Sequence, residues 1–452
     1  LMLLSSMISS MKSVARHFQS EEHELMTNDQ KVQWKNVKKS DTFNMDILKI
    51  ATAGSVDDGK STLIGRLLYE TDSLKSDQLE HIKVKSESRG FDYLDLSLAT
   101  DGLLTEREQG ITIDVSHIFF STPTRRFIIA DSPGHVEYTR NMVTGASTAQ
   151  ASILLLDARK GMVEQTRRHL YINRLLGIQH LVFAINKMDL VDFDQTRFEI
   201  IKNEVESWLQ NASMDIKTID FVPISALLGD NVTSLSKQMN WYRSSTLLEI
   251  LEKLPTISSL QEDNVLQVQH VLRPKTEQHH DYRGFAGKVN SGCFQVGDKI
   301  LVYPSGRSSQ IKSIEKYGVP VGKTQEGEST TLLLEDEIDI SRGNSIVSSE
   351  NNLQVSKQLR AEVCWMQDTN LIPGAKYWLQ LGIQKVQIKI KSINHRLELE
   401  NLKTEPTNTL GLNDIGEIDF VTAQEIVHQP FYKNKGLGAF ILIDFLTNNT
   451  AG

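Results

Sequence analysis

The stretch ATAGSVDDGKSTLIGRLL, residues 51–68, decides the fold of this chain. Its Gly54–Ser61 run has the spacing G-x-x-x-x-G-K-[ST] and stands between an apolar run that predicts a strand and a pattern that predicts a helix. Such a run turns backbone N–H groups toward phosphate oxygens, and the helix N-terminus adds partial positive charge. We expect a nucleotide phosphate chain to bind here. A tight turn without a ligand is the alternative, and other parts of the chain must decide between them.

Each residue of the run has an expected role. Lys60 is expected to act catalytically by reaching the β and γ phosphates, and the Ser61 hydroxyl is expected to ligate Mg²⁺. The other residues would line the phosphates: Gly54, Ser55, Val56, Asp57, Asp58 and Gly59. A similar string, GVPVGKT at residues 318–324, has only three residues between its glycines and contains Pro320. We reject it as a second phosphate-binding loop.

A carboxylate follows the next long strand candidate. RFIIAD ends at Asp131 and continues into DSPGH, so Asp131 is expected near the metal, which it would hold through water. Gly134 would present its N–H to a γ-phosphate, and His135 would orient an attacking water. Ser132 and Pro133 complete the segment. A lone histidine after a strand usually has a surface or packing role, but its spacing from Asp131 favours catalysis.

The motif NKMD, residues 186–189, predicts which base is read. Asp189 can accept two hydrogen bonds from the N1–H and the N2 amino group of guanine, which adenine does not offer. Asn186 would bind the purine and brace the loop, Lys187 would lie along the ring, and Met188 completes the motif. The segment SAL would aim a backbone N–H at guanine O6, through Ser225, Ala226 or Leu227. The expected ligands are therefore GTP and Mg²⁺.

Between these motifs lies DGLLTEREQGITIDVS, residues 101–116. Thr112 offers a hydroxyl to Mg²⁺ and a backbone N–H to the γ-phosphate, so it is expected to act catalytically and to order this segment only in the triphosphate state. Glu106 and Arg107 remain open between a role here and a solvated charge run.

Strand and helix patterns alternate from Met45 to about Leu254. Near-continuous apolar strand candidates predict an α/β domain whose parallel-rich sheet has helices on both faces; they are residues 47–53, 126–131, 152–157, 181–186 and 220–224. After a break at 253–263, short β-prone runs with turns follow, and a second break lies at 348–358. We predict an extension at 1–44, a nucleotide-binding domain at 45–255, and two small β-barrels at 263–348 and 356–452.

Composition limits the class of protein. The chain has 452 residues and a net charge of −8, which argues against a protein that coats nucleic acid. Its two cysteines, Cys293 and Cys364, have no Cys/His cluster beside them, which excludes a zinc site of familiar spacing and suits a reducing compartment. No apolar run is long enough to span a bilayer. We expect a cytoplasmic protein, with Met45 as an alternative start.

These residues together resemble the translation-factor-type GTPases, in which a GTP-binding domain precedes two β-barrels. The resemblance becomes closer to the GTPase subunit of the heterodimeric bacterial sulfate adenylyltransferase. It covers residues 46–449 and rests on five segments: SVDDGKSTLIGRLL, TDGLLTEREQGITID, YTRNMVTGAS, DARKGMVEQTRRH and LLEDEIDISRGN. The Val56-Asp57-Asp58 triplet and the EIDISRG segment carry the closer assignment.

The resemblance implies a division of labour. A separate smaller subunit would form adenosine 5′-phosphosulfate and pyrophosphate from ATP and sulfate, while this chain would hydrolyse GTP and couple that hydrolysis to the reaction. It implies a heterodimer, no membrane and no nucleic-acid partner. We expect no fused adenosine-phosphosulfate kinase. An elongation factor that delivers aminoacyl-tRNA shares the motifs, and a scaffold in which GTP only stabilises the fold is a further alternative.

Overall fold

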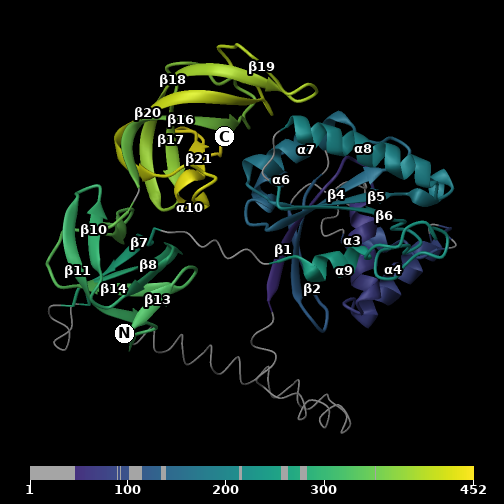
Figure 1. Cartoon of the computed structure of the whole chain (residues 1–452), viewed down its shortest axis with the longest axis horizontal. Coiled ribbons are helices and arrows are strands. Elements are labelled where there is room, and N and C mark those ends of the chain that lie inside the picture. The colour runs from purple at the N-terminus through teal and green to yellow at the C-terminus, as the bar shows by residue number, and fades with distance from the viewer. Residues whose placement is uncertain are drawn as a thin grey trace, which may run out of the picture.

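The computed structural model of the chain describes residues 46–88, 90–91, 93–100, 115–133, 139–212, 216–255, 263–274, 282–351 and 353–452. Figure 1 shows an α/β domain followed by two antiparallel β domains. The predicted fold class is confirmed by this arrangement.

A six-stranded sheet forms the first domain, in the order β2-β3-β1-β4-β5-β6. Its neighbours pair in parallel except β2, which pairs antiparallel with β3. The strands are β1 Ile47–Ala53, β2 Ser116–Ser121, β3 Arg126–Asp131, β4 Ala151–Asp157, β5 His180–Asn186 and β6 Thr218–Pro223. Every residue of β4 and β5 is buried, as expected for central parallel strands covered on both faces. The edge strand β2 was not predicted from the sequence.

Helices cover both faces of this sheet (Figure 1). Alternate strand residues belong to different cores: in β4, Ile153 and Leu155 pack with α3 and α9, whereas Leu154 and Leu156 pack with α6, α7 and α8. The helical segments are α3 Lys60–Glu70, α4 Ser76–Ser88, η1 Leu96–Ala99, α6 Thr139–Ala146, α7 Glu164–Leu175, η3 Met188–Val191, α8 Gln195–Asn211 and α9 Leu247–Lys253. Because the strands are parallel, their carboxyl ends meet along one edge, where the predicted motifs come together.

The second domain is a closed barrel. Six strands follow one another as β10-β15-β7-β8-β14-β11, and the pairing of β10 with β11 closes the ring. The strands are β7 Val265–Leu272, β8 Gly284–Ser291, β9 Cys293–Gln295, β10 Lys299–Tyr303, β11 Arg307–Lys316, β12 Val319–Val321, β13 Lys323–Gln325, β14 Ser329–Leu334 and β15 Ser345–Ser348. The rejected string at residues 318–324 lies in β12 and β13, among strands rather than before a helix.

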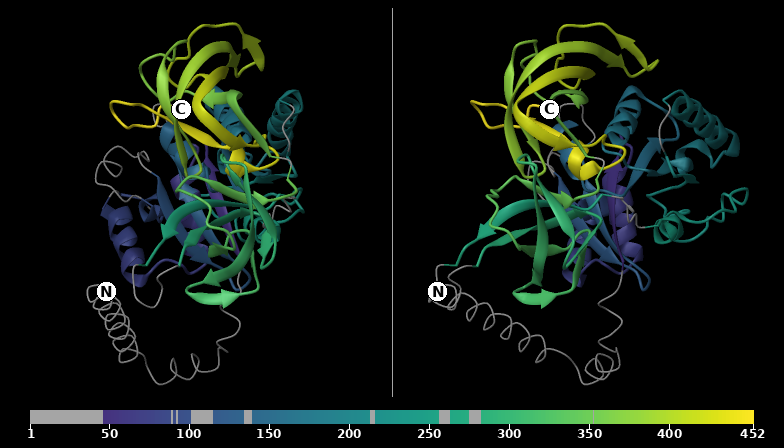
Figure 2. Two further views of the ribbon diagram at one scale, coloured as in Figure 1. Left: turned by 90° about the vertical axis from the view of Figure 1, so that its left-hand side faces the viewer. Right: turned by 60° about the vertical axis from the view of Figure 1, so that its left-hand side comes forward.

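The third domain is a curved antiparallel sheet in the order β16-β20-β18-β17-β21, with β19 paired to β18. Its elements are β16 Gln354–Cys364, β17 Lys376–Leu381, β18 Gln384–Glu398, β19 Lys403–Glu405, β20 Ile415–His428, α10 Lys435–Gly438 and β21 Phe440–Ile443. Figure 2 shows this sheet from two further directions, beside the helices of the first domain.

The first and third domains share a core. Cys364, Met366, Leu399 and Ile415 of the third domain belong to the same buried cluster as the side chains of α7 and α8. A hydrogen bond adds to the contact, since the Trp208 indole N–H donates to the Leu399 carbonyl oxygen at 3.3 Å. The two domains are therefore packed as one unit rather than joined only by a linker.

In the part of the chain that the structure describes, no helix is both long enough and apolar enough to cross a membrane.

Candidate functional site

The loop between β1 and α3 folds around the Lys60 ammonium group. Lys60 is only 7% exposed, and its Nζ donates to the carbonyl oxygens of Gly54 at 2.8 Å and Ser55 at 2.9 Å. Gly59 precedes the helix with a φ of 93°, a left-handed conformation that glycine adopts without steric strain. A methyl group on Gly59 would also collide with the Asn186 side chain. The loop therefore has the compact shape that a phosphate cradle requires.

Several charged side chains lie close to Lys60 and are partly buried from solvent. Burial lowers the pKa of Lys60, and the carboxylates of Asp131, Asp58 and Asp57 oppose that shift. Burial likewise raises the pKa of Asp58, and Lys60 opposes it. The Ser55 N–H donates to Asp58 Oδ2 at 2.6 Å, which fixes the carboxylate beneath the loop. Interactions with a charged ligand are strong in such a site because little water screens them.

The end of β3 brings a carboxylate close to the same loop. Asp131 is 1% exposed, and its Oδ1 accepts from Thr52 Oγ1 at 3.1 Å. Ser132 and Pro133 follow as buried residues, and the Ser132 hydroxyl has no hydrogen-bond partner in the described structure. Three predicted residues, Thr112, Gly134 and His135, lie outside the described residues, as do Glu106 and Arg107.

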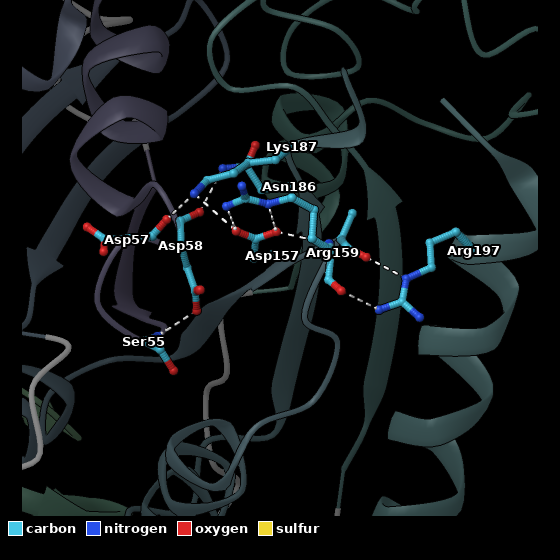
Figure 3. Close-up of polar contacts among 9 residues, drawn as sticks. Ser55, Asp57, Asp58, Asp157, Arg159, Asn186, Lys187 and Arg197 are labelled. Atoms are coloured by element: carbon cyan, nitrogen blue, oxygen red, sulfur yellow. Dashed lines mark hydrogen bonds and ion pairs between the residues drawn. The ribbon is translucent and has the colours of Figure 1, made fainter. Parts of the chain in front are cut away.

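Asn186 and Lys187 connect the predicted base-reading loop to the phosphate loop (Figure 3). Asn186 Nδ2 donates to the Asp58 carbonyl at 2.8 Å, and its Oδ1 accepts from the Ala226 N–H at 2.9 Å. Lys187 Nζ donates to the Asp57 carbonyl. The two motifs and the 225–227 segment thus form one hydrogen-bonded unit.

The remaining base-side residues lie beside this unit. Met188 is buried and begins η3, while the neighbouring Asp189 is partly exposed. The N–H groups of Ser225 and Ala226 are already bonded to Asp230 and Asn186, whereas within the described chain that of Leu227 has no partner. Of these three N–H groups, that of Leu227 therefore remains available to a ligand.

The sequence did not single out Asp157, which is the last residue of β4 and lies beside the base-side loop. Its side chain is fully buried, and it binds Arg159 by two guanidinium bonds and Lys187 by an ion pair of 3.1 Å. A signal was present, because Asp157 ends the apolar run SILLLD as Asp131 ends RFIIAD. Both carboxylates therefore lie at the carboxyl edge of the sheet.

Family models match two parts of the chain. Residues 45–256 match the Elongation factor Tu GTP binding domain, and residues 358–452 match the GTP-eEF1A C-terminal domain-like family. A solved structure of sup35 complexed with GMPPNP aligns with 93% of this chain and 97% of its own at 20% identity, with a TM-score of 0.40, too low to bear on the fold.

Curated relatives are more similar. Sulfate adenylyltransferase subunit 1 of Cellvibrio japonicus is 45% identical over 410 residues, which cover 90% of this chain and 86% of that protein. The chain belongs to the sulfate adenylyltransferase subunit 1 family. The Photobacterium profundum member is also 45% identical, over 90% of this chain and 85% of its own. The Bifunctional enzyme CysN/CysC of Mycobacterium tuberculosis is 45% identical over 89% of this chain, which spans only 66% of that longer protein.

Oxygen groups in this family member fit a magnesium ion. Ser61 lies in the first turn of α3 and its hydroxyl makes no hydrogen bond within the described residues, while Asp131 places a buried carboxylate near Lys60. Magnesium prefers such hard oxygen ligands and is usually held by few protein groups together with substrate phosphates. No cluster of three or more histidine, cysteine, aspartate or glutamate side chains occurs among the described residues, so an all-protein metal cage is not present there.

Proposed function

We propose that this chain binds and hydrolyses GTP as the GTPase subunit of a sulfate adenylyltransferase. The observation that carries the proposal is the 45% identity to Sulfate adenylyltransferase subunit 1 over nine tenths of this chain. The formed phosphate loop around Lys60 and its bonds to Asn186 and Lys187 support the nucleotide part. The adenylyl transfer itself belongs to a separate, smaller catalytic subunit.

The residues of this chain divide the work on GTP. Lys60 neutralises phosphate charge, Asp189 accepts from the guanine edge, and Asn186 keeps the two loops in register. His135 holds the attacking water in line with the γ-phosphate. Ser61, Thr112 and Asp131 would hold a magnesium ion, which when bound neutralises the charge that develops on the phosphates. The binding, orientation and water placement come from the protein.

Coupling requires that the triphosphate and diphosphate states differ in their contacts with the partner. Forming adenosine 5′-phosphosulfate from ATP and sulfate is strongly uphill, so the favourable hydrolysis of GTP has to be linked to it. We place the differential contacts on residues 100–116 and 131–148. Helix α6 lies in the second range, and Arg140 Nη2 donates to the Met366 carbonyl of the third domain at 2.5 Å, which supports a path from the nucleotide to that domain.

Reconstitution with the smaller subunit tests the proposal. Pyrophosphate release from ATP and sulfate should occur at a high rate only when GTP is present, and GDP should not replace it. The variant His135→Ala should retain GTP but lose at least about 100-fold in hydrolysis and in product formation, because the water is no longer positioned. Product formation that is equal with and without GTP would refute the coupling.

An elongation factor is the second candidate, because both family models are named for elongation factors. A GTP-loaded chain would then retain aminoacyl-tRNA on a filter. We expect no retention above that of the GDP-loaded chain, and tight GTP-dependent retention would replace the proposed function with this one.

A further inference from the structure

Asp157 lies between two loops that the proposed nucleotide would touch. Its buried carboxylate accepts from the Arg159 backbone N–H at 2.9 Å, from Arg159 Nε at 3.0 Å and from Arg159 Nη2 at 2.6 Å. Lys187 Nζ adds the ion pair of 3.1 Å. Burying an unpaired carboxylate would cost free energy, so the burial of Asp157 depends on Arg159 and Lys187 together. Figure 3 shows the three side chains beside the phosphate loop.

Lys187 is held in an unusual position by this set. Its backbone has a φ of 62°, a left-handed conformation that a lysine rarely adopts. Conformations of this kind persist only where the surroundings hold them. Here the same ammonium group is bound by Asp157 on one side and by the Asp57 carbonyl of the phosphate loop on the other.

The turn that follows Asp157 at the end of β4 is itself anchored from α8. Arg197 Nε donates to the Ala158 carbonyl at 2.5 Å, and its Nη2 donates to the Arg159 carbonyl at 3.0 Å. The N–H groups of Lys160 and Gly161 close the turn onto the Asp157 carbonyl. The carboxylate is therefore presented to Lys187 from a rigid support rather than from a free loop.

We propose that Asp157 and Arg159 are positioning residues for the guanine nucleotide: they fix the Lys187 ammonium between the base-side loop and the phosphate loop and so set the lifetime of bound GTP and GDP. The inference rests on the proposed function, since it concerns the same nucleotide. It assigns no contact between Arg159 and the ligand. Asp157 acts through Lys187, and Arg159 acts through Asp157.

The electrostatics agree with this geometry. Burial alone would raise the pKa of Asp157, but the hydrogen bonds from Arg159 and Lys187 outweigh burial and hold the pKa well below its usual range. Arg159 also interacts electrostatically with the Asp189 and Asp57 carboxylates, more weakly than with Asp157. An Asp157–Arg159 ion pair that only stabilised its own turn would not need the contact between Asp157 and Lys187.

The test measures dissociation of fluorescently labelled GDP and of a labelled, non-hydrolysable GTP analogue from the full chain. Asp157→Asn should speed the release of both by at least about tenfold, because the ion pair with Lys187 is replaced by a weaker hydrogen bond from the ammonium group to a neutral amide oxygen. Arg159→Ala should speed both by about threefold to tenfold, and Arg159→Lys should recover part of the loss. Both nucleotides should change by the same factor.

Arg360→Ala is the matched control. Arg360 makes a two-bond pair with Asp419 at 2.8 and 3.1 Å in the third domain, so its loss removes the same kind of contact away from the site. This variant should release nucleotide as wild type does. In Lys187→Ala, adding Arg159→Ala should have little further effect, because the intermediary is gone.

The outcomes separate the inference from the proposed function. A wild-type chain that retains no guanine nucleotide refutes the proposed function. A wild-type chain that retains it, with release unchanged in both Asp157→Asn and Arg159→Ala, overturns the inference. A lower melting temperature with unchanged release also overturns it, since the pair would then be structural only. If Asp157→Asn does not fold, the half-exposed Arg159 position carries the test.

Discussion

His169 of α7 is a titratable side chain sealed within the first domain. It is 1% exposed, its Nε2 lies 2.9 Å from Gln165 Nε2, and its Nδ1 has no partner in the described structure. With the Gln165 amide nitrogen as donor, His169 Nε2 accepts, as it can only in the neutral ring. Burial, with help from the positive charges of Lys60 and Arg168, lowers the pKa of His169 to about 3.

This histidine should make the first domain sensitive to acid. The pKa in the folded state lies below the ordinary value of 6.5, so the stabilisation is complete above pH 6.5 and is lost as the pH falls from 6.5 toward 3. The free energy of unfolding should fall in that window by up to about 1.4 kcal/mol per pH unit from this group. Urea unfolding at several pH values, followed by far-ultraviolet circular dichroism, measures the slope. His169→Gln should flatten it.

His117→Gln serves as the control for that measurement, because His117 is exposed on β2. Its slope should match that of the wild type. An equal slope in wild type and His169→Gln would show that other groups dominate the acid response.

At the scale of elements, helix α3 and the 3₁₀ helix η1 are packed unusually closely. A methyl group on Gly65 of α3 would collide with the Leu96 carbonyl oxygen, which is backbone and cannot simply rotate away. In an exposed helix, glycine to alanine is stabilising by about 1 kcal/mol. At Gly65, the same replacement should instead destabilise the protein.

Gly65→Ala should therefore lower the free energy of unfolding by about 1–3 kcal/mol, because α3 and η1 must separate to admit the methyl group. Chemical denaturation of the full chain measures it. Gln210→Ala, at an exposed position near the end of α8, provides a propensity control and should change stability by less than about 0.5 kcal/mol. A Gly65→Ala chain as stable as the wild type would show that η1 shifts at no cost.

The sequence predicts the buried strands of the first domain well and its edge poorly. The runs at 47–53 and 126–131 match β1 and β3 residue for residue, because both are apolar and bounded by polar residues. Strand β2 is half-exposed, and its SHIFFS run has an apolar stretch of only three residues and no clean alternation. The Asp157 to Lys187 contact was missed for another reason, since pairing across two loops depends on backbone geometry that spacing alone does not give.

For the whole molecule, the contact between the first and third domains includes a polar centre. Glu362 of β16 accepts from Tyr171 Oη at 2.8 Å and pairs with Arg174 at 3.3 Å. Burial, together with the Glu362 charge, raises the pKa of Tyr171, so the phenol stays protonated and donates. Both domains therefore contribute to one hydrogen-bonded group beside the shared core.

Glu362→Lys should loosen the docking of the third domain. The change replaces a partly exposed ion pair, worth about 1 kcal/mol or less, by repulsion between the introduced ammonium group and the Arg174 guanidinium. The radius of gyration from small-angle X-ray scattering should increase while the circular dichroism spectrum stays the same. Glu335→Lys makes the same charge change on the second domain and should leave the radius unchanged. An unaltered radius in both variants would show that the apolar contacts alone hold the domains together.

The core shared by the first and third domains has a consequence for synthesis on the ribosome. Side chains of α7 and α8 are covered by residues as late as Ile415, which is translated about 160 residues after the first domain ends near residue 255. At elongation rates of about 5–20 residues per second, that apolar surface stays uncovered for roughly 10–30 s in each nascent chain. A chaperone that binds emerging chains should therefore matter more for the yield of this protein than the stability of its finished form would suggest.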